Sequence, residues 1–122
     1  KIIDMQIKKT GKLFSFCCMA PVIVSKKNKY LSSFNKLGSD IGLLFQISDD
    51  LIDYKGNTKK VGKKTKKDIK KGKATLISLL GYQNTIKYGD KIKLNIFKKI
   101  KKFGKKADDL KNTVNFILER SK

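Results

Sequence analysis

Histidine is absent from the sequence, and its only two cysteines, Cys17 and Cys18, are adjacent. Neighbouring cysteines rarely pair with each other, and the chain has no C-x-x-C motif. Zinc sites and Cys/His nucleophiles are therefore poorly supported, because both need those residue types at defined spacings. We expect both thiols to be small core residues in a reducing compartment, which predicts a cytoplasmic protein.

Long apolar runs and arginine are equally scarce. No apolar run reaches the roughly 18 residues that a membrane span needs, so we expect no transmembrane segment. The 122 residues include 30 Lys and Arg against 10 Asp and Glu, a net charge of +20, and Arg120 is the single arginine. A basic helical nucleic-acid-binding protein is therefore one alternative. Base and phosphate recognition favour arginine, however, so diffuse lysine argues against a specific nucleic-acid partner.

Apolar residues recur at helical spacing along most of the chain, and no stretch alternates as a strand would. The sequence therefore predicts an all-α fold. Residues 12–24 are apolar nearly all round, which predicts a buried helix with a kink or break at Pro21. The expected helices are residues 1–9, 12–24, 29 to 53 or 54, 73–80, 82–103 and 107–119, with Gly81 and Gly104 ending the fourth and fifth.

Two glycine-containing stretches separate the early helices. Lys9, Thr10 and Gly11 are expected to interrupt the first helical stretch, and Gly56 is expected to end the third helix. Residues 56–72 hold many lysines and almost no apolar residue. A loop of this length is either functional or disordered.

One stretch, residues 42–56, reads GLLFQISDDLIDYKG and carries three aspartates in the pattern D-D-x-x-D. At about 100° per residue on a helix, four polar side chains fall in one arc of roughly 100°, and the apolar ones fall opposite. Gly42 lies one turn earlier in the same stripe, where it is expected to leave room above the carboxylates. The polar face consists of Gln46, Asp49, Asp50 and Asp53.

Carboxylates this close together on one helix face repel one another, so a cation is expected among them. Lysine side chains are one candidate, and they would leave a solvated acidic face. Mg²⁺ is the other candidate, because it binds one or two carboxylates, keeps waters and completes its shell with substrate phosphate oxygens.

Basic and polar motifs flank the acidic stretch. K-T-G at residues 9–11 precedes it, and G-K at residues 62–63, Asp68 and G-K-A-T at residues 72–75 follow it. Lysine acts as a point charge on a phosphate, and Mg²⁺ links a phosphate to carboxylates. Together these groups would bind a diphosphate and stabilise it as a leaving group.

In this order, K-T-G, GLLFQISDDLID, G-K…D…G-K-A-T and L-L-G resemble the C-terminal half of a trans-isoprenyl diphosphate synthase of the farnesyl and geranylgeranyl type. The similarity runs from about Met5 to the end, where VNFILERSK is similar to the closing helix of that family. The resemblance implies an isoprenoid-synthase-type helical bundle around a central cavity, which forms a homodimer when full length. Residues 1–122 would then be a single partial domain that lacks the N-terminal half.

The resemblance also implies a reaction. Mg²⁺ and basic residues would remove the diphosphate from an allylic diphosphate, isopentenyl diphosphate would attack the resulting cation head to tail, and a proton would be lost. Asp49 would be the main Mg²⁺ ligand, and Asp50 and Asp53 would support the ion and its waters or pair with the loop lysines. The other implied roles are diphosphate binding by Lys9, Lys63 and Lys73, orientation of the reacting groups by Thr10 and Gln46, and a hydrocarbon wall near Phe14.

Some features depart from the family pattern. Lys66 stands where the family usually has a glycine, and Ile77 where it often has a proline. The first aspartate-rich motif and the residues that bind isopentenyl diphosphate belong to the N-terminal half, so we expect residues 1–122 alone to be inactive. A non-catalytic partner subunit of a prenyl synthase stays an alternative, and Thr10 could simply cap the next helix.

Overall fold

The computed structural model describes residues 1–61 and 75–121, and all regular structure in these ranges is helical. The predicted all-α fold is thereby confirmed for the described residues. The elements are α1 (Ile2–Gln6), the π-helical turn η1 (Ile7–Gly11), α2 (Lys12–Val24), the 3₁₀ turn η2 (Asn28–Tyr30), α3 (Leu31–Val61), α4 (Leu76–Leu80), α5 (Tyr82–Ile100), the 3₁₀ helix η4 (Lys101–Ala107) and α6 (Asp108–Glu119).

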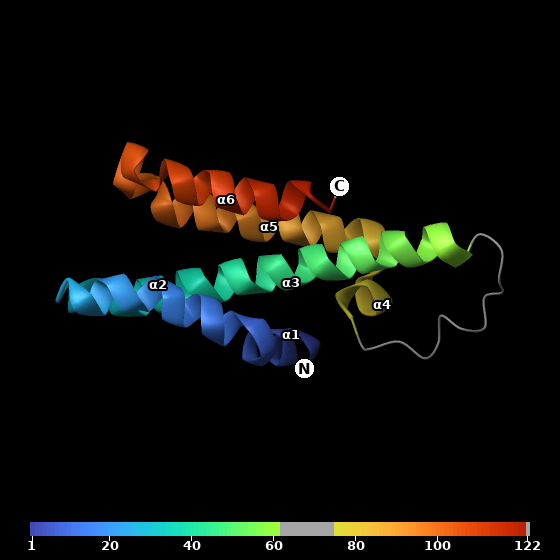
Figure 1. Ribbon diagram of the computed structural model, residues 1–122, viewed down its shortest axis with the longest axis horizontal. Coiled ribbons are helices and arrows are strands. Elements are labelled where there is room, and N and C mark those ends of the chain that lie inside the picture. Colours follow the sequence, from blue (N-terminus) through green and yellow to red (C-terminus); the bar gives the residue numbers. More distant parts are fainter. Residues whose placement is uncertain (62–74, 122) are drawn as a thin grey trace.

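Helix α3 lies at the centre of the described fold, with α1 and α2 along one side and α5 and α6 along the other (Figure 1). Its apolar residues recur every three or four positions, so one stripe of the helix is continuously apolar. Leu44, Ile47 and Leu51 of this stripe are fully buried. The residues of α5 and α6 that share their core include Ile92, Ile96, Ile100, Val114, Ile117 and Leu118.

Backbone contact joins the first helices to α3 at two glycines. A Cβ atom added to Gly42 would lie 2.6 Å from the Cα of Gly11, and one added to Gly38 would lie 2.5 Å from the carbonyl oxygen of Phe14. Both positions therefore need glycine, because only glycine allows the two backbones to approach so closely. The prediction that Gly42 leaves room above the carboxylates is wrong, since Gly11 fills that space.

Gly56 does not end α3, which continues to Val61. A glycine weakens a helix interior by roughly 1 kcal/mol but ends the helix readily only when its φ turns positive. Gly56 has no positive φ, so residues 56–61 of the predicted loop are helical. The rest of that loop, with Lys63 and Lys66, and Lys73 just beyond it, lie outside the described residues.

The K-T-G motif and Pro21 also leave the helix continuous. Residues 7–11 form the π-helical turn that carries α1 into α2, and such wide turns are frequent at functional sites. Pro21 lies in the last turn of α2, where its missing N–H costs one hydrogen bond, and the helix ends only at Val24.

The ends of α4 and α5 follow signals in the sequence. The Thr75 hydroxyl caps α4 by accepting a hydrogen bond from the backbone N–H of Ser78 at 3.2 Å. Gly81 and Gly104 have φ angles of 79° and 56°, which favour glycine and stop regular helix. The breaks predicted at these two glycines are confirmed.

Helix α2 is not buried, although its composition predicted that it would be. Leu13, Phe16 and Val24 are 66%, 61% and 83% exposed, because in the described part of the chain α3 covers α2 from one side. Cys17 is exposed too, contrary to the prediction of a core thiol, whereas Cys18 is half-buried. Burial, and to a lesser degree the Cys17 thiol, raises the pKa of Cys18. None of the described helices has both the length and the apolar content to cross a membrane.

Replacing Gly42 with alanine is expected to lower the free energy of unfolding by roughly 1–3 kcal/mol, since the new methyl group would meet the backbone of Gly11. Gly56→Ala is the matched control, because among the described residues nothing beyond its own helix and chain neighbours would lie within 4 Å of a Cβ at that position. Alanine there should raise stability by roughly 1 kcal/mol if α3 continues through it. Urea denaturation measures both effects, and a Gly42→Ala variant as stable as Gly56→Ala would contradict the backbone contact.

Candidate functional site

Two of the predicted acidic residues on α3 are already engaged by side chains. Asp49 and Asp50 are half-buried, and Asp53 is exposed one turn later. Oδ1 of Asp49 accepts a hydrogen bond from Nη2 of Arg120 at 2.6 Å. Oδ1 of Asp50 accepts one from Nε2 of Gln46 at 3.2 Å. The first two carboxylates are therefore held in place by the fold itself.

Arg120 reaches Asp49 from the end of α6, and the sequence analysis missed it. The Ser48 hydroxyl donates a hydrogen bond to the carbonyl of Ile117 at 2.5 Å, which holds the end of α6 against α3. From there Nε of Arg120 donates to the Ser48 hydroxyl at 3.1 Å, and its guanidinium carbon lies 4.5 Å from the centroid of the Phe45 ring. The sequence does contain one signal for this residue, since Arg120 is the single arginine among 30 basic residues. A planar guanidinium can stack on a ring and donate several hydrogen bonds in a fixed geometry, which the ammonium of lysine cannot do.

The K-T-G turn meets the acidic helix through one side-chain hydrogen bond. Thr10 in η1 donates its hydroxyl to Oε1 of Gln46 at 3.1 Å. The amide nitrogen of Gln46 donates in turn to Asp50, so these three residues form a continuous polar chain from η1 to the carboxylates. Thr10 does not cap α2, whose first turn has no side-chain cap.

The other predicted residues lie outside this cluster. Lys9 is exposed next to Thr10, and the described part of the chain gives it no ion pair. Lys63 and Lys73 fall beyond the described residues. Phe14, the predicted hydrocarbon wall, packs against Phe45 with ring centroids 5.3 Å apart.

Among the described residues, no three His, Cys, Asp or Glu side chains lie close enough together to hold a metal ion. Asp49, Asp50 and Asp53 therefore do not form a closed metal cage by themselves. Their oxygens still match Mg²⁺, which binds one or two carboxylates and fills the rest of its shell with waters and substrate phosphates. Single or paired carboxylates are a donor type that Mg²⁺ accepts, so the chemistry of these residues fits the ion.

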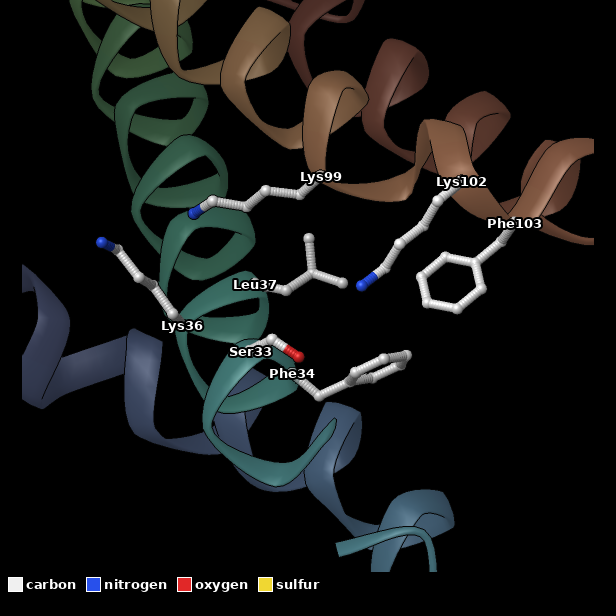
Figure 2. Close-up of a pocket in the computed structure, with 7 residues that line it drawn as sticks. All are labelled: Ser33, Phe34, Lys36, Leu37, Lys99, Lys102 and Phe103. Atoms are coloured by element: carbon white, nitrogen blue, oxygen red, sulfur yellow. The ribbon is translucent and has the colours of Figure 1, made fainter. Parts of the chain in front are cut away.

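A pocket of about 220 Å³ lies elsewhere, between the start of α3 and the end of α5. Figure 2 shows the Lys102 ammonium pointing between Leu37 and Phe103, and it lies 5.2 Å from the centroid of the Phe103 ring. At 1.5 Å per residue, Asp49 lies roughly 18 Å farther along α3 than Leu37, so this pocket is separate from the predicted site. Its lining residues are Ser33, Phe34, Lys36, Leu37, Lys99, Lys102 and Phe103.

Comparison with known proteins agrees with the motifs. The family model described as polyprenyl synthetase matches residues 1–117. The chain is 29% identical to a farnesyl diphosphate synthase of Micrococcus luteus, an alignment that covers 97% of this chain and 41% of the relative. It is 32% identical to a geranylgeranyl diphosphate synthase of Cyanophora paradoxa, over 96% of this chain and 39% of the relative.

A farnesyl diphosphate synthase of Bacillus subtilis is 34% identical over 73% of this chain and 29% of its own length. The chain thus spans about two fifths of the length of the first two relatives. No solved structure gives a significant match.

Removing the Thr10 hydroxyl with Thr10→Val is expected to lower the free energy of unfolding by roughly 1 kcal/mol, because Gln46 loses a donor at a part-buried position. Thr10→Ser keeps the hydroxyl and is the matched control. Urea denaturation of both variants, each with Gln46 intact and with Gln46→Ala, isolates the energy of the pair. Identical unfolding free energies for the valine and serine variants would show that this bond does not stabilise the fold.

Proposed function

Because this chain belongs to the polyprenyl synthetase family, we propose that it supplies part of the diphosphate site of a prenyltransferase. That enzyme would condense an allylic diphosphate with isopentenyl diphosphate head to tail in isoprenoid biosynthesis, and it would depend on Mg²⁺. The observation that carries the proposal is the polar chain from Thr10 through Gln46 to Asp50, which joins the K-T-G turn to the aspartates.

Mg²⁺ would be held by Asp49, with Asp50 and Asp53 supporting it and its waters. When bound, the ion supplies positive charge that stabilises a departing diphosphate. The half-buried positions of Asp49 and Asp50 support this role, because charges interact more strongly near the protein than in bulk water. The exposure of Asp53 suits a role through bound waters rather than direct ligation.

Lys9, Lys63 and Lys73 would bind the diphosphate. Lys9 sits next to Thr10 in η1, and no carboxylate of the described chain pairs with it, so its ammonium is available to a phosphate. Lysine acts on a phosphate as a point charge and needs no fixed fork geometry.

Thr10 and Gln46 would orient the reacting groups. Gln46 receives a hydrogen bond from Thr10 on its oxygen and donates one from its nitrogen to Asp50. Both ends of the amide are thus engaged, which fixes its orientation beside the carboxylates. Supporting hydrogen bonds of this kind hold metal-binding carboxylates in a defined position.

We further propose a short product of farnesyl or geranylgeranyl length, since two relatives that align with nearly the whole chain are named as those synthases.

We also propose a homodimer and a cytoplasmic location. Exposed apolar side chains on α2, among them Leu13 and Phe16, support the homodimer, because exposed apolar patches often mark surfaces that pack against another protein chain. The free thiols of Cys17 and Cys18 are typical of a reducing compartment.

Asp49→Asn is expected to weaken Mg²⁺-dependent binding of inorganic diphosphate to the full chain roughly tenfold or more, because a charged oxygen ligand is lost. Lys9→Gln should weaken diphosphate binding by a similar factor while leaving its Mg²⁺ dependence intact. Asp109→Asn on the exposed start of α6 is the matched control and should bind like wild type. Titration calorimetry with and without Mg²⁺ measures all three.

Diphosphate binding that none of these substitutions changes would contradict the proposed site. Tight DNA binding that falls steeply with salt and is unaffected by Asp49→Asn would instead favour the nucleic-acid alternative.

A further inference from the structure

The Arg120 side chain makes more contacts than a simple surface ion pair needs. Its Nη2 lies 2.6 Å from Oδ1 of Asp49, and the two side chains are only 27% and 40% exposed. Its Nε donates to the Ser48 hydroxyl and to the carbonyl of Ile117, at 3.1 and 3.3 Å. Its guanidinium also lies over the Phe45 ring.

Arginine, rather than lysine, suits this position for a physical reason. All other basic residues of the chain are lysines, yet Arg120 must stack on a ring, donate from Nε and donate from Nη2 at once. A planar guanidinium meets these three requirements together, whereas an ammonium is a point charge on a flexible stem. The use of the single arginine here indicates that the geometry of the cation at Asp49 matters.

The backbone that carries Arg120 is anchored on both sides. Leu118 is fully buried two residues before it. Ser121 directly after it is 1% exposed, and its hydroxyl donates to the carbonyl of Leu118 at 2.7 Å. The guanidinium can therefore leave Asp49 by a side-chain rotation, without moving the end of α6.

We propose that Arg120 is the placeholder cation of Asp49: it neutralises the carboxylate when no metal is bound and competes with Mg²⁺ for it. This inference rests on the proposed function, since it takes Asp49 as a metal ligand. Three carboxylates within five residues of one helix repel one another, and a cation at Asp49 lowers that repulsion. A second cation binding at the same carboxylate must displace the guanidinium or bind against its charge, so Arg120 weakens metal binding.

Mn²⁺ is the probe, because its binding can be followed by electron paramagnetic resonance without any substrate. Arg120→Gln in the full chain is expected to bind Mn²⁺ at least about fivefold more tightly, because repulsion between two unit charges about 4 Å apart in water is worth that factor and Mn²⁺ carries two charges. Lys98→Gln, which removes a charge from an exposed position on α5, is the matched control and should stay within twofold of wild type.

Arg120→Lys separates competition from a purely structural role. It keeps the charge but loses the stacking and the fork, so its Mn²⁺ affinity should lie between those of wild type and Arg120→Gln if charge competition operates. Mn²⁺ binding by Arg120→Gln that equals or falls below wild type would overturn the proposal, as would an Arg120→Lys variant that binds as tightly as Arg120→Gln.

Asp49→Asn distinguishes the two levels of the argument. If it abolishes Mn²⁺ binding while Arg120→Gln binds like wild type, the proposed metal site stands and only the placeholder role fails. If the wild-type chain binds no Mn²⁺, with or without inorganic diphosphate, both the proposed function and the placeholder role are overturned.

A thermal melt without metal gives a second, independent readout. Arg120→Gln should lower the melting temperature by about 4 °C, because the carboxylates lose their neutralising partner. Saturating Mn²⁺ should close most of that gap, since the metal binds the variant more tightly than wild type. A gap that Mn²⁺ leaves unchanged would mean that Arg120 acts on the fold alone.

Discussion

The contact between the backbones of Gly11 and Gly42 is the constraint on which the candidate site depends. It lets η1 lie directly on α3, so that Thr10, one residue before Gly11, reaches Gln46, one turn after Gly42. A side chain at position 42 would push the two segments apart, because its Cβ would lie 2.6 Å from the Cα of Gly11. The polar chain toward Asp50 therefore depends on the glycine at position 42, which lets the backbone of η1 come this close to α3.

Two distant segments of the chain converge on one turn of α3. Thr10 is 36 residues from Gln46, and Arg120 is 71 residues from Asp49, yet both contact the stretch from Phe45 to Asp50. The apolar stripe of the same helix holds α5 and α6 through Leu44, Ile47 and Leu51. One side of α3 thus packs in the core, and the other side carries the polar residues of the candidate site.

The helices and the acidic face could be predicted from the sequence because both are local periodic patterns, and the D-D-x-x-D spacing decides which face Asp49 takes. The Arg120 contact could not, because it depends on how α6 packs against α3. Gly42 was misinterpreted since a glycine indicates open space and close backbone contact equally well. The exposure of Phe16 was not predicted. An apolar composition indicates that a helix packs against other elements, but it does not show that the described chain contains those elements. The prediction that Gly56 ends the helix is wrong because whether a glycine ends a helix depends on its φ angle, which the sequence does not reveal.

Phe45 occupies a position between two groups of different character. One neighbour is the Phe14 ring, with centroids 5.3 Å apart, and the other is the Arg120 guanidinium, 4.5 Å from the ring centroid. The Phe14 ring of α2 and the Arg120 guanidinium that pairs with Asp49 thus both contact the same aromatic ring. Any displacement of the Phe14 ring would therefore reach the guanidinium at Asp49 through the Phe45 ring.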